Sequence, residues 1–170
     1  MPSLHHIGYW VDDLESAQAR WGKDLGVGPF QVIAHVPFDA FDVAAVGPSE
    51  RDAPAGVVRF DHSAAFAAWG PVVVELDQVH AIDERLAAAY GVVPGAVSHV
   101  SWMVQDLAGE SARLERLGCR LISTARSGVI AVAWHHGGPL FPHPIEVHQR
   151  NDVIAGMHDR LTAPRAAGSG

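Results

Sequence analysis

The sequence predicts an α+β protein made of two βαβββ modules, related by a pseudo-two-fold axis, that form a curled mixed β-sheet cleft with the helices outside. Three observations support this prediction: an internal repeat, a strand followed by a helix at the start of each copy, and a hairpin pattern near the end of each copy. Repeats are sought first because they define the architecture of the whole chain. The length of 170 residues suits a single domain.

The repeat is clearest at the start of each copy. LHHIGYWVDDLESA (4–17) aligns with VSHVSWMVQDLAGESA (97–112), which places His6 on His99 and Asp13 on Asp106 at a constant offset. Isoleucine, valine and aromatic residues open each copy, which is typical of a strand. Apolar residues then recur at steps of three and four along 14–25 and 107–117, which predicts helices. Aspartates stand at the expected N-caps and glycines at the expected C-terminal ends: Asp13, Asp106, Gly26 and Gly118.

The remaining elements follow from alternation of apolar and polar residues and from turn residues. We expect module one at about 4–79, a linking helix within 80–92, module two at about 97–150, a last helix at 151–162 and a flexible tail at 163–170, with 1–163 as one domain. Residues 37–61 lack periodicity and are expected to form a long loop. The expected later strands are Pro29–Val36, Ala64–Trp69, Val72–Gln78, Arg120–Thr124, Val129–His135 and Ile145–Gln149.

Composition excludes several function classes. The net charge is −7, and the twelve Lys and Arg residues are scattered, which argues against binding to nucleic acid or to an anionic membrane. No segment approaches the ~20 apolar residues that cross a bilayer. Cys119 is the single cysteine, and the chain starts without a basic and then apolar leader. We therefore expect a cytoplasmic protein whose partners are a small-molecule substrate and a second copy of the chain in a homodimer.

Four residues are candidate metal ligands. His6 and His99 lie on the first strand of each copy, and Glu75 and Glu146 lie on the last strand of each copy. Two sheets curled around one cleft would bring the matched pairs face to face. Two buried carboxylates repel each other, and a divalent cation would neutralise them. Imidazole ligands suit zinc, nickel, cobalt or iron, and the sequence does not separate these four metals.

The chain resembles the vicinal oxygen chelate superfamily, which includes glyoxalase I, methylmalonyl-CoA epimerase, bleomycin resistance proteins and extradiol dioxygenases. The strings LHHIGYWVDDL, LGVGPF, VVVEL, VSHVSWMVQDL and HPIEVHQR carry the resemblance, which spans 4–150 and looks most like the glyoxalase-like branch. It implies the same four metal ligands. Two features depart from the epimerases: Glu75 stands where they often have glutamine, and their catalytic carboxylate has no secure counterpart here.

The resemblance implies a metal-dependent isomerase, epimerase or lyase that moves a proton next to a carbonyl. A ligand carboxylate, Glu75 or Glu146, would act as base, and we favour Glu146. His148 shares a strand face with Glu146 and is a candidate acid or base. Two alternatives stay open: an iron(II) ring-cleaving dioxygenase, which uses two histidines and one glutamate, and a metal-free sequestering protein of the bleomycin resistance type.

Other aromatic and histidine residues have weaker patterns. Aromatic side chains that could line a substrate pocket are Trp10, Phe41, Trp69 and Trp134. Trp10 shares a strand face with His6 and Phe41 lies in the long loop, so these two are favoured. His5 precedes His6 on a strand, so we expect it to point to the opposite face in a structural role.

Overall fold

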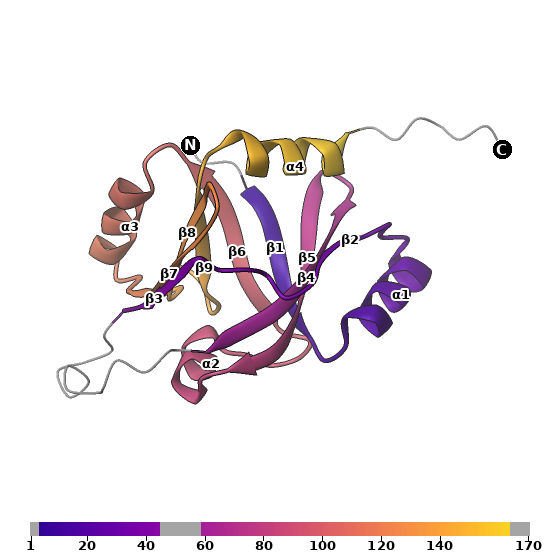
Figure 1. Cartoon of the computed structure of the whole chain (residues 1–170), viewed down its shortest axis with the longest axis horizontal. Coiled ribbons are helices and arrows are strands. Elements are labelled where there is room, and N and C mark those ends of the chain that lie inside the picture. Colours follow the sequence, from indigo (N-terminus) through magenta and orange to yellow (C-terminus); the bar gives the residue numbers. More distant parts are fainter. Residues whose placement is uncertain (1–3, 45–58, 164–170) are drawn as a thin grey trace.

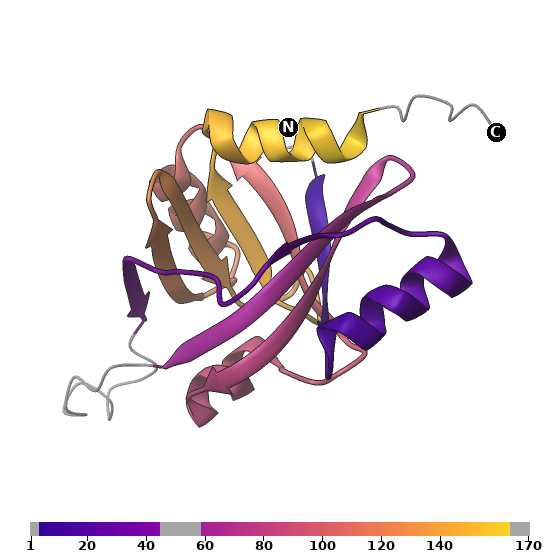
Figure 2. The same cartoon turned by 45° about the vertical axis from the view of Figure 1, so that its right-hand side comes forward.

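The structure is a computed structural model that describes residues 4–44 and 59–163, and its centre is one curled mixed sheet (Figures 1 and 2). The strands run in the spatial order β2-β4-β5-β1-β6-β9-β8-β7-β3. The strands are β1 (Leu4–Val11), β2 (Gln31–Ile33), β3 (Ala40–Val43), β4 (Phe60–Trp69), β5 (Val72–Ile82), β6 (Val97–Val104), β7 (Leu121–Ser127), β8 (Ile130–His135) and β9 (Ile145–Gln149). The helices are α1 (Leu14–Leu25), α2 (Glu84–Tyr90), α3 (Leu107–Arg116) and α4 (Asp152–Thr162).

The strand order shows the two modules directly. Strands β2-β4-β5-β1 form one half of the sheet and β6-β9-β8-β7 form the other, in mirrored chain order. The first strands β1 and β6 pair antiparallel at the centre, and each also pairs in parallel with the last strand of its own module, β5 or β9. This arrangement confirms the predicted fold class. It also places the ends of both repeats next to one another in the middle of the sheet.

The repeat extends to individual hydrogen bonds. Asp13 and Asp106 cap α1 and α3, each accepting a hydrogen bond from the backbone N–H three residues later. At the same helix starts, the side-chain carbonyls of Gln78 and Gln149 accept from the next backbone N–H groups, at 3.0 Å in both modules. Each glutamine lies three residues after a predicted glutamate ligand, so these bonds hold the ligand strand against the helix start.

One strand was not expected from the sequence, and several others differ in length: for example, β2 is shorter than predicted, β4 begins earlier and β5 ends later. The segment 37–61, expected to be a loop, contains β3, which pairs antiparallel with β7 at the far edge of module two. The remainder of that segment, 45–58, lies outside the described residues. Strand β3 was not predictable from periodicity because it is only four residues long and is stabilised by hydrogen bonds to residues about eighty positions later. Through β3, module one closes the outer edge of module two.

The helices lie on different sides of the sheet. Helix α1 packs on β4 and β5, and α3 packs on β8 and β9, so both cover the outside of the curl (Figure 1). Helix α4 crosses one end of the curl, where Met157 and Leu161 pack against Phe66 and Val73. Helix α2 lies at the other end, with Leu86 and Tyr90 in the largest core cluster. No helix in the described ranges is long and apolar enough to cross a membrane.

Candidate metal centre

The four predicted ligands meet at the centre of the sheet. His6, Glu75, His99 and Glu146 come from β1, β5, β6 and β9, and each has no more than 6 % of its surface exposed. Backbone register explains the convergence, because Gly8 pairs with Glu75 in the same way that Ser101 pairs with Glu146. One ligand atom from each of the four residues lies within 4.8 Å of the others. The cluster therefore has the symmetry of the repeat.

The distances within the cluster fit ligands of one cation. The Nε2 atom of His6 lies 2.7 Å from Oε2 of Glu75 and 2.9 Å from Oε2 of Glu146. The Nε2 atom of His99 lies 3.2 and 3.3 Å from the same two oxygens, and 2.8 Å from Nε2 of His6. Atoms bound to one zinc-like ion at about 2.1 Å are roughly 3.0–3.4 Å apart, so the two His99–glutamate distances lie in that range and the three shorter distances would lengthen slightly around an ion. The buried Oε2 of Glu75 makes no aligned hydrogen bond, which also suits a metal ligand.

Two matched β-bulges shape the centre. The register between β1 and β6 shifts between Leu4 and His6, which makes His5 the extra residue on β1. It shifts again between Gly8 and Tyr9, which makes Ser98 the extra residue on β6. His5 and Ser98 occupy equivalent positions of the repeat, each directly before a histidine ligand. A bulge re-aims side chains locally, and here it turns the residue before each ligand toward that ligand.

The bulged residues contact the far side of each imidazole. Nδ1 of His5 lies 2.6 Å from Nδ1 of His6, and their rings pack edge to face. The expectation that His5 points to the opposite face is therefore wrong, because strand alternation fails at a bulge. In module two, Oγ of Ser98 lies 3.0 Å from Nδ1 of His99 and donates to Asp77 at 2.9 Å. Metal-bound histidines commonly have such a partner on the second ring nitrogen.

Electrostatics in the metal-free chain show how strongly the site attracts positive charge. Burial lowers the pKa of a histidine, but the carboxylates of Glu75 and Glu146 outweigh burial and raise the pKa of His6 to about 9. They raise the pKa of His99 in the same way. Burial would raise the pKa of Glu75 and Glu146, yet the neighbouring histidines hold both below the usual value. Within the part of the chain described, both carboxylates form ion pairs with histidines only.

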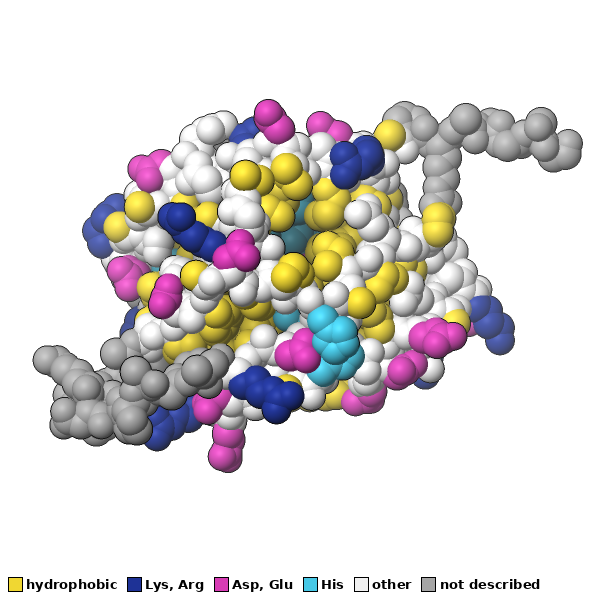
Figure 3. All heavy atoms as spheres, viewed as in Figure 1, with side chains coloured by type: hydrophobic (Ala, Val, Ile, Leu, Met, Phe, Trp, Pro, Cys, Tyr) yellow, Lys and Arg dark blue, Asp and Glu magenta, His cyan; other side chains and the backbone are white. Residues whose placement is uncertain are grey.

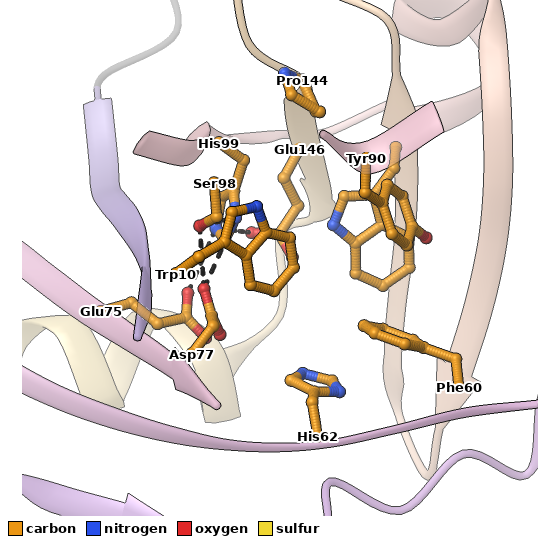
Figure 4. A pocket seen from close by; sticks show the side chains of 11 residues that line it. Trp10, Phe60, His62, Glu75, Asp77, Tyr90, Ser98, His99, Pro144 and Glu146 are labelled. Atoms are coloured by element: carbon orange, nitrogen blue, oxygen red, sulfur yellow. Dashed lines mark hydrogen bonds and ion pairs between the residues drawn. The ribbon is translucent and has the colours of Figure 1, made fainter. Parts of the chain in front are cut away.

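Two cavities adjoin the cluster. The smaller, about 20 Å³, lies on the α2 side and has room for about one water molecule. Figure 4 shows its lining, with Glu75, Asp77 and His99 grouped opposite Phe60 and His62. The larger, about 330 Å³, lies between the sheet and α4. Figure 3 shows a hollow on this face with hydrophobic side chains around it and histidine at its floor. The larger cavity therefore adjoins the cluster on the α4 side.

The predicted pocket aromatics lie in different places. Trp134 lines both cavities, and Trp10 lines the small one. Phe41 lines neither cavity and packs against Phe38 and Trp134 in the core. Trp69 ends β4, is 46 % exposed and packs against Trp21, on the outer side with α1. Trp69 and Phe41 are therefore not brought to the cluster.

Two further residues, one in each module, lie beside the glutamates, and only one of them was assigned a role from the sequence. His148 lies where it was expected, beside Glu146, with Nε2 of the imidazole 2.8 Å from Oε2 of the carboxylate. Asp77 is its counterpart in module one, two residues after Glu75, and burial together with Glu75 raises its pKa well above the usual value. The repeat could have identified Asp77, because Asp77 occupies the position in module one that is equivalent to His148 in module two. Neither bulge was detectable from alternation.

The fold and the centre define a class of protein: two βαβββ modules whose central strands build a buried site of two histidines and two glutamates in a cleft. The chain belongs to the glyoxalase/bleomycin resistance protein/dioxygenase superfamily, whose sequence profile matches residues 5–135. The match ends before β9, so the repeat and the structure, rather than the profile, assign Glu146 and His148 to the site. A search of curated protein sequences gives no significant match.

Solved structures show the same fold at low sequence identity. A hypothetical protein, BH1468 from Bacillus halodurans, is 14 % identical with a TM-score of 0.57, and the alignment covers 88 % of this chain and 95 % of that one. Methylmalonyl-CoA epimerase from Mycobacterium tuberculosis is 18 % identical with a TM-score of 0.53, and the alignment covers 90 % of this chain and 91 % of that one. At this identity the similarity concerns the fold alone.

Proposed function

We propose that this protein is a divalent-metal-dependent enzyme that moves a proton next to a carbonyl group of a small oxygenated organic substrate, as an isomerase, epimerase or lyase of the glyoxalase-like type. The observation that carries the proposal is the convergence of four buried ligand atoms, two nitrogens and two oxygens, beside a cavity of about 330 Å³. Such a volume is at the lower end of the range for small-molecule sites.

The donor set supports a transition-metal ion. Two neutral imidazoles and two carboxylates would balance a charge of 2+, and nitrogen donors favour zinc, nickel, cobalt or iron over magnesium or calcium. In the metal-free chain, protons on His6 and His99 take the place of the missing positive charge. A bound ion would supply Lewis acidity that polarises a carbonyl oxygen and stabilises negative charge on it. Four protein ligands leave room for substrate oxygens only if the coordination number exceeds four or one carboxylate leaves.

Glu146 is the residue that we assign as base. Its Oε2 lies 2.8 Å from Nε2 of His148, and both residues line the larger cavity. The other ring nitrogen of His148 is buried without a hydrogen-bond partner. A proton taken up by Glu146 can therefore pass to His148 at one edge of the cavity, which is the arrangement needed for acid–base chemistry near neutral pH. The equivalent neighbour of Glu75 among the described residues is Asp77, which does not line the larger cavity.

The test combines metal content with proton exchange. Protein purified without a chelator should contain about one transition-metal ion per chain, and removal and return of the metal should lower and restore thermal stability. The metal-loaded protein should exchange hydrogen for deuterium next to the carbonyl in a panel of hydroxy ketones, thiohemiacetals and acyl thioesters followed by NMR. Absence of any metal effect would favour sequestration in the cavity, and oxygen uptake with a catechol would favour ring cleavage. The homodimer and cytoplasmic location stay predictions.

A further inference from the structure

We propose that Arg126 and Arg160 bind an anionic group of the substrate, a carboxylate or a phosphate, at the mouth of the larger cavity. The substrate of the metal centre would then be an organic anion with an apolar middle and an oxygenated end. This inference rests on the proposed function, because it assumes that the larger cavity holds the substrate.

The cavity walls are apolar between the two ends. The lining side chains include Ile33, Val36, Phe66, Val132, Ile154 and Met157, which come from the sheet, from the segment after β2 and from α4. Such walls would bind a hydrocarbon or aromatic body and would exclude water from the site. The candidate metal cluster, with His5 and His148, contributes polar groups to the lining of this apolar space.

Charge on the cavity wall differs from charge on the whole chain. The protein has a net charge of −7, yet among the described residues that line this cavity the only Lys, Arg, Asp or Glu side chains besides Glu75 and Glu146 are Arg126 and Arg160. Arg126 lies on β7 and Arg160 on α4, so two separate elements each contribute one positive charge to the same cavity. Within residues 4–44 and 59–163, neither guanidinium forms an ion pair or a hydrogen bond with another side chain.

Guanidinium groups without a partner beside an apolar cavity favour an anionic ligand. A guanidinium stays charged at all relevant pH values and offers paired N–H donors that match a carboxylate or phosphate. Both arginines are exposed residues of the cavity lining, so each guanidinium is available to an anion that enters from solvent. Two further polar atoms point to a ligand: Nε2 of His5 and Nδ1 of His148 are buried without partners, and both residues line the cavity. The cavity thus has unsatisfied polar groups near the cluster and unpaired positive charge elsewhere on its wall.

Binding of simple probes to the full chain tests the proposal. Octanoate, octyl phosphate and octanamide have the same apolar body and differ in the charged group, and titration calorimetry would compare their affinities in both metal-loaded and chelator-treated protein. We expect the two anions to bind about tenfold more tightly than octanamide in both forms. Arg126→Gln and Arg160→Gln should each weaken anion binding about fivefold and leave octanamide binding unchanged. The tighter of the two anions would identify the carboxylate or the phosphate as the natural group.

Arg116→Gln is the matched control, since Arg116 is exposed on α3 and lines none of the cavities described above. The proposal is overturned if octanamide binds as tightly as the anions, if no probe binds at millimolar concentration, or if the cavity arginine variants behave like Arg116→Gln. An anion preference that depends on metal and survives both arginine substitutions would place the anion on the metal and also overturn it. Because binding is measured without turnover, a failure here leaves the proposed proton transfer standing, and a failure to bind metal leaves this test intact.

Discussion

Nδ1 of His5 lies 2.6 Å from Nδ1 of His6, so two neighbouring residues of one strand contact each other through their rings. If Nε2 of His6 binds the metal, its Nδ1 carries the proton and donates to His5. Burial, followed by the effect of His6, lowers the pKa of His5 to about 3, so His5 stays neutral and accepts this hydrogen bond. With a metal bound, His5 would thus favour the tautomer of His6 whose Nε2 is free to bind the ion.

Replacement of this partner should weaken metal binding. His5→Phe keeps the ring but removes the acceptor, and we expect metal affinity to fall by about 10- to 100-fold while the fold is retained. Ser98→Ala, at the equivalent position beside His99, should act in the same direction. Competition with a coloured chelator measures both. His158→Gln is the control, because this ring packs near His5 but touches no ligand. Equal affinity in His5→Phe and the control would remove the positioning role.

Glu146→Gln should separate the base from the fold. The side chain keeps its shape but no longer accepts a proton, and turnover in the exchange assay should fall by about 10²- to 10⁴-fold. Glu75→Gln is the matched comparison because Glu75 occupies the same place in the other module. Glu75→Gln should lower metal affinity, but its activity per bound metal ion should exceed that of Glu146→Gln. Full activity of Glu146→Gln, or the reverse ranking of the two variants, would reassign the base.

His62 should make folding stability depend on pH. Burial lowers the pKa of His62 to about 4, from an ordinary value of 6.5, and its ring stacks on Phe60 with centroids 4.4 Å apart. The unfolded chain therefore binds a proton between pH 6.5 and 4 that the folded chain does not, so this contribution is complete above pH 6.5 and is lost as the pH falls. It amounts to about 3 kcal/mol when it is lost in full.

Urea denaturation of chelator-treated protein at pH 7 and pH 5 checks this expectation. In His62→Phe, the loss of stability between these two values should be smaller than in the natural sequence by about 2 kcal/mol. The difference between the two proteins cancels the other titrating groups. An identical loss in both would show that His62 does not take part.

Gly8 should tolerate no side chain. A Cβ atom at Gly8 would collide with the side chains of Ser98 and His99, because the His99 ring lies over this position. Gly8→Ala should therefore lower stability by about 1–3 kcal/mol and displace His99 from the cluster, with weaker metal binding. Gly22→Ala in α1 is the contrast, since its Cβ would meet only ordinary contact at 3.6 Å, and it should raise stability by up to about 1 kcal/mol. Thermal denaturation and metal titration measure both effects.

Much of the fold was predictable because patterns in module one recur at the matching positions of module two. Each helix start has a capping aspartate and each histidine ligand has an equivalent, so one weak pattern is checked by a second. The strand β3 was not predictable, because its four residues show little periodicity and are held by pairing with β7 and by packing of Phe41 on Phe38 and Trp134. The same limit applies to Trp69 and Phe41. An aromatic side chain suits a pocket, a surface position or a core position equally well, so its type alone does not place it.

The sequence by itself determined the two modules, their capped helices and the four residues of the candidate metal centre, because these depend on local periodicity and on matched positions in a repeat. Only the tertiary structure decided how those residues are surrounded. The bulges at His5 and Ser98 arise from pairing between β1 and β6, which are far apart in the chain. The cavity with Arg126 and Arg160 forms only when α4 packs across the curled sheet. Such features depend on contacts between distant segments, and no pattern within a single segment records them.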